Sequence, residues 1–291
     1  MNGEYFGFLN INKPKGMSSH NVVYAVRKFL GIKQVGHSGT LDPLATGVLV
    51  VGVGRATRLF EFLQEKKEYL ATIKFGYESD TLDTEGELIK NEDYFPQEES
   101  LIAVFKEFLG DTEQIPPKYS AVKVNGKKLY EMARKGQEIG EIKARPVKIE
   151  NIDLIDIDGC EAKIKVECSK GTYIRSLIRD IAQKLGTTAV MSDLIRTKSG
   201  KFYIENSLEL NENTQIEDLE NSLINPLEVL QYKKIEVNEK DFKKIKNGAT
   251  VDIQGDNDLE QGETVILTYE NQIASVADVI GTKFIQKKVL L

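Results

Sequence analysis

The residue whose surroundings most clearly indicate chemistry is Asp42, a single carboxylate in the glycine-rich stretch 36–54, GHSGTLDPLATGVLVVGVG. Its apolar neighbours Leu41 and Leu44 would take the acid out of water and raise its pKa, which favours the protonated form. A cation opposite the carboxylate would reverse that shift and keep the acid ionised. The position therefore predicts a reactive carboxylate with a specific, positively charged partner.

The backbone around this acid allows two interpretations. In the first, Gly36 and Gly39 permit positive φ, and Pro43 disfavours the α region at Asp42, so that a tight turn presents the carboxylate outward. In the second, Asp42 is the N-cap of a helix and Pro43 is its first residue, which is a purely structural arrangement. Composition alone leaves both interpretations open.

Two further side chains lie where a structural role and a catalytic role are both plausible. Residues 67–75 alternate in polarity and predict a strand whose apolar face carries Tyr69, either as a core residue or as an active-site group. Residues 170–185 have apolar residues at helical spacing and end at Gly186. Arg175 lies off that stripe in the first turn, where a cation opposes the helix dipole, so its presence indicates a negative group facing it.

The elements that must position these groups follow from periodicity and turn residues. Apolar and alternating runs predict strands, amphipathic runs predict helices, and Asn125-Gly126 predicts a two-residue hairpin turn. We expect strands at 6–11, 47–53, 147–155 and 161–168, helices from Ser18 or Ser19 to 30 and at 56–63, 100–109 and 129–134, and a hairpin at 122–129. From about Tyr232 a small β domain is expected, with strands near 235–237, 264–269, 273–280 and 284–290 and a helix at 239–247.

Charge is distributed unevenly along the 291 residues. The net charge of -6 argues against a nucleic-acid partner only if it is taken globally. Residues 118–148 contain nine Lys and Arg against three Asp and Glu, whereas residues 201–230 contain one Lys against seven Asp and Glu. The acidic stretch therefore masks a basic one, which is either a solvated face or a nucleic-acid contact.

Composition excludes several classes of protein. Hydrophobic content of 41% and charged content of 29% are ordinary for a globular protein, and no apolar run approaches the roughly 18 residues of a membrane span. No signal peptide is indicated, so we expect a cytoplasmic protein. Two cysteines, Cys160 and Cys168, and two histidines lack metal-ligand spacing, so we expect buried thiols, no disulfide and no metal. The acids after residue 78 hint at a calcium site, but their spacing does not fit an EF-hand loop.

The run GHSGTLDPLATGVL closely resembles the active-site signature of the bacterial tRNA pseudouridine-55 synthase family, in which the Asp of this run is catalytic. Ser38 stands where the family usually has Thr. The runs INKPKGMSSH, YLATIKFGYESDTLDTEG, KGTYIRSLIRDIA and SDLIRTKSG are similar to further motifs of that family. The resemblance covers residues 6–200 strongly and the remainder weakly.

The resemblance also implies roles for individual side chains. Asp42, Tyr69 and Arg175 would be catalytic, with Arg175 pairing with Asp42 and Tyr69 stacking on the base and moving a proton. Tyr173 and Leu194 would line the base pocket. His37 would contact the flipped nucleotide or fill the position that it leaves, although a lone His is more often structural. The basic stretch resembles an insertion that grips the RNA stem, with Lys127, Lys128, Arg134 and Lys135 as its contacts.

The resemblance also implies a fold, a division into two domains and an activity. The fold would be α+β, a pseudouridine synthase fold with a mixed central sheet and flanking helices, plus a small C-terminal barrel of the PUA type. Residues 1–230 would form the catalytic domain, with the insertion at about 118–145, and residues 231–291 the PUA-like domain. The reaction would isomerise one uridine in the TΨC arm of tRNA, at position 55, without cofactor or metal, and we expect a monomer.

Two other functions compete with this one. An RNA-binding or RNA-folding protein with vestigial chemistry would share the fold, but the presence of Asp42, Tyr69 and Arg175 argues against it. A guide-RNA-dependent relative from archaea and eukaryotes shares the catalytic motifs but lacks the basic insertion. The insertion therefore favours the standalone enzyme.

Overall fold

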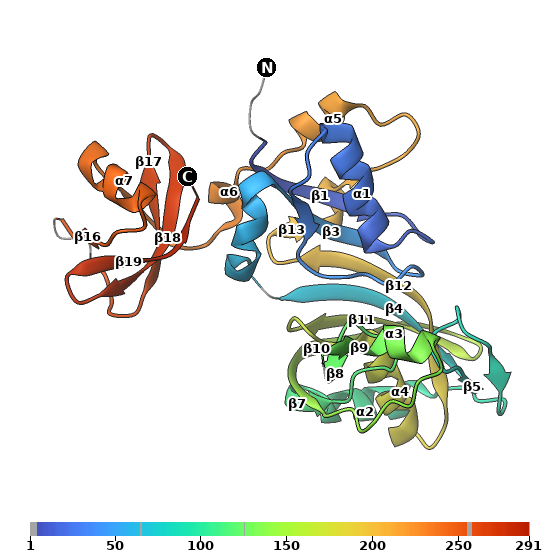
Figure 1. Cartoon of the computed structure of the whole chain (residues 1–291). Coiled ribbons are helices and arrows are strands. Elements are labelled where there is room, and N and C mark those ends of the chain that lie inside the picture. Colours follow the sequence, from blue (N-terminus) through green and yellow to red (C-terminus); the bar gives the residue numbers. More distant parts are fainter. Residues whose placement is uncertain (1–4, 65, 125, 255–257, 291) are drawn as a thin grey trace.

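The computed structural model describes residues 5–64, 66–124, 126–254 and 258–290. A mixed sheet of ten strands forms the centre of the molecule, and a second sheet of five strands lies beside it (Figure 1). Neighbours in the central sheet are antiparallel except for β1 with β14 and β3 with β12. In order across the sheet the strands are β14 (Leu208–Glu209), β1 (Gly7–Lys13), β3 (Thr46–Val53), β12 (Ala189–Ser199), β4 (Lys67–Phe75), β11 (Glu161–Cys168), β10 (Arg145–Asp158) and β7 (Gly110–Gln114), while β2 (Val35–His37) pairs with β3 and β13 (Phe202–Tyr203) with β12.

Helices cover one face of the central sheet. The largest buried cluster joins apolar side chains of α1, α2 and α4 to inward-facing residues of β1, β3, β4 and β11. Ser18 caps α1 by accepting a hydrogen bond from the Asn21 amide, and Gly31 ends the helix in the left-handed conformation, as the sequence predicts. The helices are α1 (Ser19–Leu30), α2 (Glu98–Glu107), α3 (Leu129–Arg134), α4 (Ile174–Lys184), α5 (Ile216–Asn221), α6 (Pro226–Val229) and α7 (Glu239–Lys246), with 3₁₀ turns η1 (Gly54–Phe62) and η2 (Ile204–Asn206).

The face of the central sheet opposite the helices explains why the sequence of β3 is continuously apolar whereas that of β4 alternates in polarity. In β3, Leu49 and Val51 pack toward the helices, whereas Val48 and Val50 pack against η1 and the C-terminal sheet. A strand buried on both faces reads as a continuous apolar run, as 47–53 does. In β4 only Tyr69 and the residues that alternate with it are buried, so its polarity alternates.

The C-terminal sheet curls as a half-barrel in the order β15-β17-β18-β19-β16. Its inner side chains form a core of their own with α7, and four of its residues join the cluster that covers β1 and β3. Lys288 also pairs with Glu61 of η1 at 2.7 Å. Its strands are β15 (Lys233–Glu236), β16 (Val251–Asp252), β17 (Thr264–Tyr269), β18 (Gln272–Ile280) and β19 (Lys283–Val289).

Some boundaries differ from those predicted. The short helix expected at 56–63 is present as a 3₁₀ helix at 54–62, and α4 begins at Ile174 rather than near residue 170. The basic hairpin is present as β8 (Lys123–Val124) paired with β9 (Lys127–Lys128), while Asn125 of its turn lies outside the described residues. A further short hairpin consists of β5 (Tyr77–Glu78) and β6 (Ile89–Lys90). Cys160 and Cys168 are free thiols, and no described helix is long and apolar enough to cross a membrane.

Candidate active site

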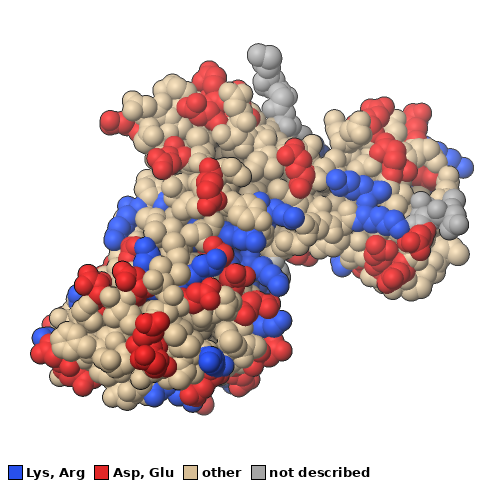
Figure 2. Space-filling view, turned by 180° about the vertical axis from the view of Figure 1, so that it is seen from behind, with Lys and Arg blue, Asp and Glu red and all other residues tan. Residues whose placement is uncertain are grey.

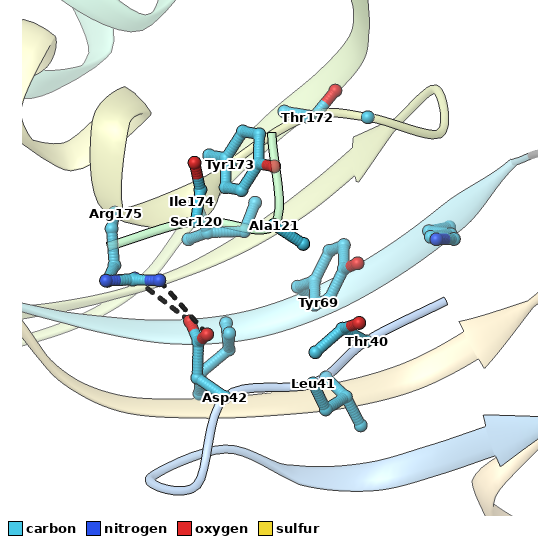
Figure 3. Close-up of a pocket in the computed structure, with 13 residues that line it drawn as sticks. Thr40, Leu41, Asp42, Tyr69, Ser120, Ala121, Thr172, Tyr173, Ile174 and Arg175 are labelled. Atoms are coloured by element: carbon cyan, nitrogen blue, oxygen red, sulfur yellow. Dashed lines mark hydrogen bonds and ion pairs between the residues drawn. The ribbon is translucent and has the colours of Figure 1, made fainter. Parts of the chain in front are cut away.

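Asp42 and Arg175 form an ion pair through two atoms of each group. The Nε atom of Arg175 lies 2.9 Å from Oδ2 of Asp42, and its Nη2 atom donates to Oδ1 at 3.0 Å (Figure 3). Asp42 stands on the loop between β2 and β3, and Arg175 in the first turn of α4. The two residues are 133 positions apart in the sequence, and a bidentate contact of this kind fixes both charge and orientation.

The remaining guanidinium hydrogens of Arg175 are also engaged. Nη1 donates to the Thr81 carbonyl at 2.8 Å and lies 3.5 Å from the Asp83 carboxylate, and Nη2 donates to the Tyr119 carbonyl at 3.0 Å. The Arg175 side chain is 5% exposed and that of Asp83 is 4% exposed, whereas the Asp42 side chain is 31% exposed. These contacts fix the orientation of the Arg175 side chain. Of the Arg175, Asp83 and Asp42 side chains, only that of Asp42 is exposed enough to contact a ligand.

Burial and charge act on Asp42 in opposite directions. Removal from water raises the pKa of Asp42 above its ordinary value, and the neighbouring Asp83 adds to that rise. The Arg175 guanidinium opposes the shift by stabilising the carboxylate. The balance leaves an acid that is more basic than an ordinary surface aspartate, which suits a group that must attack a carbon or accept a proton.

The loop that carries Asp42 is held at both ends of its turn. The fully buried Lys13 ammonium donates to the carbonyls of Pro14, Met17 and Pro43 at 2.9, 2.7 and 3.3 Å. Burial lowers the pKa of Lys13 to about 8. The hydroxyl of Ser19 bonds both backbone groups of Leu41, at 3.0 and 2.8 Å. The segment that follows β1 and the start of α1 thus support this loop directly.

The structure decides between the two interpretations of this loop. No helix begins at Pro43; the Ala45 amide bonds the Asp42 carbonyl at 3.1 Å, and the chain continues into β3. Gly36 and Gly39, which permit positive φ, do not adopt it; the glycines of residues 36–54 with positive φ are Gly47, with φ +97, and Gly54, with φ +60. A Cβ on Gly47 would lie 2.3 Å from the Arg196 carbonyl, so this glycine permits β3 and β12 to approach.

A cavity of about 180 Å³ opens beside the Asp42 carboxylate. Tyr69 of β4, Leu194 of β12 and Tyr173 at the start of α4 line it together with Asp42 and Arg175 (Figure 3). Tyr69 is 6% exposed and also belongs to the main core, so both predicted roles of this residue are compatible. Burial raises the pKa of Tyr69, and the nearby Arg196 guanidinium opposes the rise. The cavity combines one carboxylate with flat apolar walls, which suits a planar polar ring.

A wider cleft of about 660 Å³ leads away from Asp42 toward the basic hairpin and α3. Lys128 and Arg134 line this cleft, whereas the exposed Lys127 and Lys135 do not. Tyr130 lies between them, with Lys128 Nζ 5.5 Å and the Arg134 guanidinium carbon 5.9 Å from the centre of its ring. Figure 2 shows Lys and Arg gathered across the waist of the molecule, with Asp and Glu above and below. The predicted basic residues are thus divided between the cleft and the outer surface.

His37 is not brought to either cavity that contains Asp42. It lies in β2, half-buried, and its Nδ1 atom has no hydrogen-bond partner among the described residues. Burial and the Arg196 guanidinium lower the pKa of His37, which keeps the imidazole neutral. Sequence position alone, five residues before Asp42, did not predict that the intervening loop would turn the two side chains apart.

Two residues of the site were not singled out from the sequence. Asp83, which lies in the run YLATIKFGYESDTLDTEG that resembles a family motif but was given no role in the site, is the second acid of Arg175. Lys67 lines the smaller cavity, and its position two residues before Tyr69 places it on the same face of β4. Among the described residues, no group of three or more His, Cys, Asp or Glu side chains is arranged to hold a metal ion.

Comparison with known proteins gives the chain a family context. Residues 27–174 match the N-terminal domain of the TruB family of pseudouridylate synthases, and residues 175–230 match the C-terminal domain of tRNA pseudouridylate synthase B. The chain is 44% identical over 248 residues to tRNA pseudouridine synthase B of Clostridium tetani, covering 84% of this chain and 85% of that one. It is 42% identical over 280 residues to the protein of the same name from Heliobacterium mobile, covering 94% and 90%.

Solved structures give the same fold. A crystal structure of a Cbf5–Nop10–Gar1 complex matches with a TM-score of 0.73 and 27% identity, covering 98% of this chain and 85% of that one. The Nop10–Cbf5 complex of an archaeal box H/ACA particle matches with a TM-score of 0.71 and 25% identity, covering 99% and 87%. The mixed central sheet and the curled C-terminal sheet are therefore both shared with known proteins.

Proposed function

Because the chain belongs to the TruB family of pseudouridylate synthases, we propose that it converts a specific uridine of tRNA to pseudouridine. The observation that carries this proposal is the bidentate pair of Asp42 and Arg175 at the edge of a cavity walled by Tyr69 and Leu194. The pair supplies a partly exposed carboxyl group held in a fixed orientation, and the walls supply surfaces for a planar base.

The reaction would proceed on a nucleotide that has left its stack, since the cavity admits a base but no duplex. The Asp42 carboxylate would promote cleavage of the bond between the sugar and N1, acting as a group that can attack and later leave. The uracil would then rotate within the cavity and rejoin the sugar through C5. Arg175 would keep Asp42 ionised and oriented throughout.

Tyr69 and the other cavity walls would complete the reaction. The ring of Tyr69 offers a π face for the uracil, and its hydroxyl is a candidate for taking part in proton transfer at C5, passing its own proton on as it receives another. Leu194 and Tyr173 would hold the base from its other sides. These groups belong to β4, β12 and α4, which are rigid elements, so the geometry would persist as the base turns.

The RNA partner would bind beyond the cavity. The insertion at about 118–145 resembles the RNA-gripping insertion of bacterial relatives, so the TΨC arm would lie in the cleft lined by Lys128 and Arg134. The target uridine would be the one at position 55. Residues 1–230 would be the catalytic domain and 231–291 a PUA-like RNA-binding domain, since the two sheets have separate cores. The enzyme would act as a cytoplasmic monomer.

A direct test uses the purified chain and unmodified tRNA transcript without any guide RNA. Pseudouridine would be mapped on the product, with the Asp42→Asn variant as the negative control. Formation at position 55 by wild type alone supports the proposal. Product that appears only after a guide RNA is added would identify the guide-dependent alternative, and tight tRNA binding without product would identify an RNA-binding protein.

A further inference from the structure

The ammonium group of Lys67 has no partner in the part of the chain that the structure describes. The residue is half-buried on β4 and faces the cavity beside Tyr69. It makes neither a hydrogen bond nor an ion pair with any described residue. A lysine that is partly removed from water without an acceptor is costly, so it suggests that the partner is a ligand.

A second cation lies directly behind it. Arg196 of β12 is 1% exposed; it donates from Nε to the Val48 carbonyl at 2.6 Å and from Nη2 to the Gly39 carbonyl at 3.2 Å, and it also interacts with the Tyr69 hydroxyl, so that its described partners are neutral. Its buried Nη1 atom has no hydrogen-bond partner among the described residues. The guanidinium is therefore held firmly, and none of the carboxylates described by the structure lies within ion-pair distance of it.

The two cations converge beside Gly39. A Cβ built on that glycine would lie 2.9 Å from Nζ of Lys67 and 3.8 Å from Nη1 of Arg196. Any larger residue at this position would displace the ammonium, so the glycine is explained by the space that Lys67 occupies. This role takes the place of the positive φ that glycine permits at this position.

The groups that surround Lys67 are neutral or positive. Burial and Arg196 of β12 lower the pKa of Lys67 to about 8, and no carboxylate of a described residue is among the causes of this shift. Cys168 of β11 is adjacent, and burial raises the pKa of that thiol to about 11, which keeps it uncharged. His37 of β2 is a neutral imidazole at ordinary pH, because burial and the same arginine lower its pKa. Among the described residues, the immediate surroundings of the Lys67 ammonium are therefore electropositive, and the Asp42 carboxylate that lines the same cavity does not pair with it.

Lys67 also forms the wall of a second cavity of about 340 Å³. Its described lining includes Ser38, Ser199 and Lys201, and the acid among the described lining residues, Glu61, is paired with Lys288. The lysine therefore stands between the base cavity and a basic, hydroxyl-lined hollow. A nucleotide whose base enters the first cavity would pass its backbone close to this point.

We propose that Lys67, backed by Arg196, binds a backbone phosphodiester adjacent to the uridine that enters the cavity. The proposal rests on the function proposed above. Its consequence is mechanical: the contact would hold the sugar-phosphate backbone in place while the detached uracil turns. An ammonium with a fixed guanidinium behind it is suited to a phosphate anion.

The test combines protein variants with an RNA in which the negative charge of a single backbone phosphate is removed. A T-arm stem-loop would carry a neutral methylphosphonate either 5′ or 3′ of the target uridine, and dissociation constants and single-turnover rates would be measured. Lys67→Met is expected to weaken binding of the unmodified RNA by about 10- to 100-fold, the range for a charge-assisted hydrogen bond. Lys74→Met on the same strand is the matched control, because Lys74 pairs with Glu161 away from the cavity.

The decisive quantity is the coupling between the two changes. At one of the two positions, the methylphosphonate should weaken binding by wild type but cause no further loss in Lys67→Met, and Lys67→Arg should retain the response. Independent, multiplicative losses at both positions would overturn the proposal. So would a loss in single-turnover rate with unchanged affinity, which would assign Lys67 to the uracil instead.

A further variant, Gly39→Ala, is tested for its affinity and for the sensitivity of that affinity to the methylphosphonate. Gly39→Ala leaves Lys67 present but displaces its ammonium, so binding should fall and become insensitive to the same methylphosphonate. A binding defect that stays sensitive to it would contradict the proposal. Because these readouts are affinities, they remain decisive if wild type forms no pseudouridine, and that separate result would reject the proposed function itself.

Discussion

The guanidinium of Arg175 joins Asp42 to Asp83, with Nε 2.9 Å from the first carboxylate and Nη1 3.5 Å from the second. The two acids differ in exposure, since the Asp83 side chain is 4% exposed and the Asp42 side chain is 31% exposed. One arginine thus balances a buried structural acid and an accessible reactive acid. Substitution of each acid is therefore expected to have a different effect.

Replacing the reactive acid should remove the chemistry and leave recognition. In Asp42→Asn the shape of the side chain is kept and the carboxylate is lost, so we expect no pseudouridine, with tRNA affinity within about ten-fold of wild type. Product formation by quench-and-map assay and affinity by filter binding check this. Multiple-turnover product from the variant would contradict the assignment of Asp42.

Replacing the buried acid should act through Arg175. In Asp83→Asn the guanidinium loses its second anion and the hydrogen bond from the Thr81 hydroxyl to a carboxylate oxygen, at 2.6 Å, is weakened. We expect the single-turnover rate to fall by about 10- to 100-fold, the cost of a disturbed charge-assisted contact, with little change in affinity. Asp93→Asn, an exposed acid paired only with Lys90, is the matched control. Equal losses in both variants would exclude a specific role for Asp83.

Removing one hydroxyl should separate stacking from proton transfer. Tyr69→Phe keeps the ring that walls the cavity and loses the hydroxyl beside Arg196. We expect tRNA binding to persist and turnover to fail, because the hydroxyl that would relay the proton at C5 is lost. A rapid-quench time course measures this directly. Unimpaired turnover would restrict Tyr69 to stacking.

The raised pKa of Asp42 predicts a cost in stability at neutral pH. A carboxyl whose pKa is higher in the folded than in the unfolded state binds its proton more tightly when folded, so stability falls as pH rises between the two pKa values. Asp42→Asn should therefore melt at least as high as wild type at pH 7, and the difference should shrink as pH falls toward about 4. Thermal melts across this range test it, and a variant destabilised at pH 7 would contradict the sign.

The basic insertion should contribute through the two residues that face the cleft. Lys128 and Arg134 line it, whereas Lys127 and Lys135 lie outside. Replacing the first pair with Gln should flatten the dependence of log affinity on log salt by at most about 2 units, since each phosphate contact contributes up to about 0.9. The second pair, replaced in the same way, is the control of equal charge and should change the slope less.

The same experiment separates gripping from chemistry. Single-turnover rates at saturating tRNA should stay near wild type for both double variants, because none of the four side chains contacts the Asp42 carboxylate. Identical slopes for the two pairs would show that the cleft does not select between them. A lower saturating rate in either variant would mean that the insertion also positions the reacting nucleotide.

The sequence by itself determined the local elements. The cap at Ser18, the stop at Gly31 and the alternation from Lys67 to Phe75 act between residues close in the chain, and each appears in the structure where it was predicted. Asp42 was also identifiable, since a carboxylate between leucines is unusual whatever surrounds it. The family motifs added its expected partner, Arg175.

Only the tertiary structure decided which distant groups meet. The second acid of Arg175 and the cation Arg196 behind Lys67 depend on how strands and loops far apart in the sequence are packed, and the absence of His37 from the two Asp42 cavities depends on how the loop between the two residues turns. The role of Gly39 likewise could not be predicted from turn preferences, because its small size makes room for Lys67, which lies on another strand. Periodicity reports which face of an element is buried, whereas charge pairing depends on what covers that face.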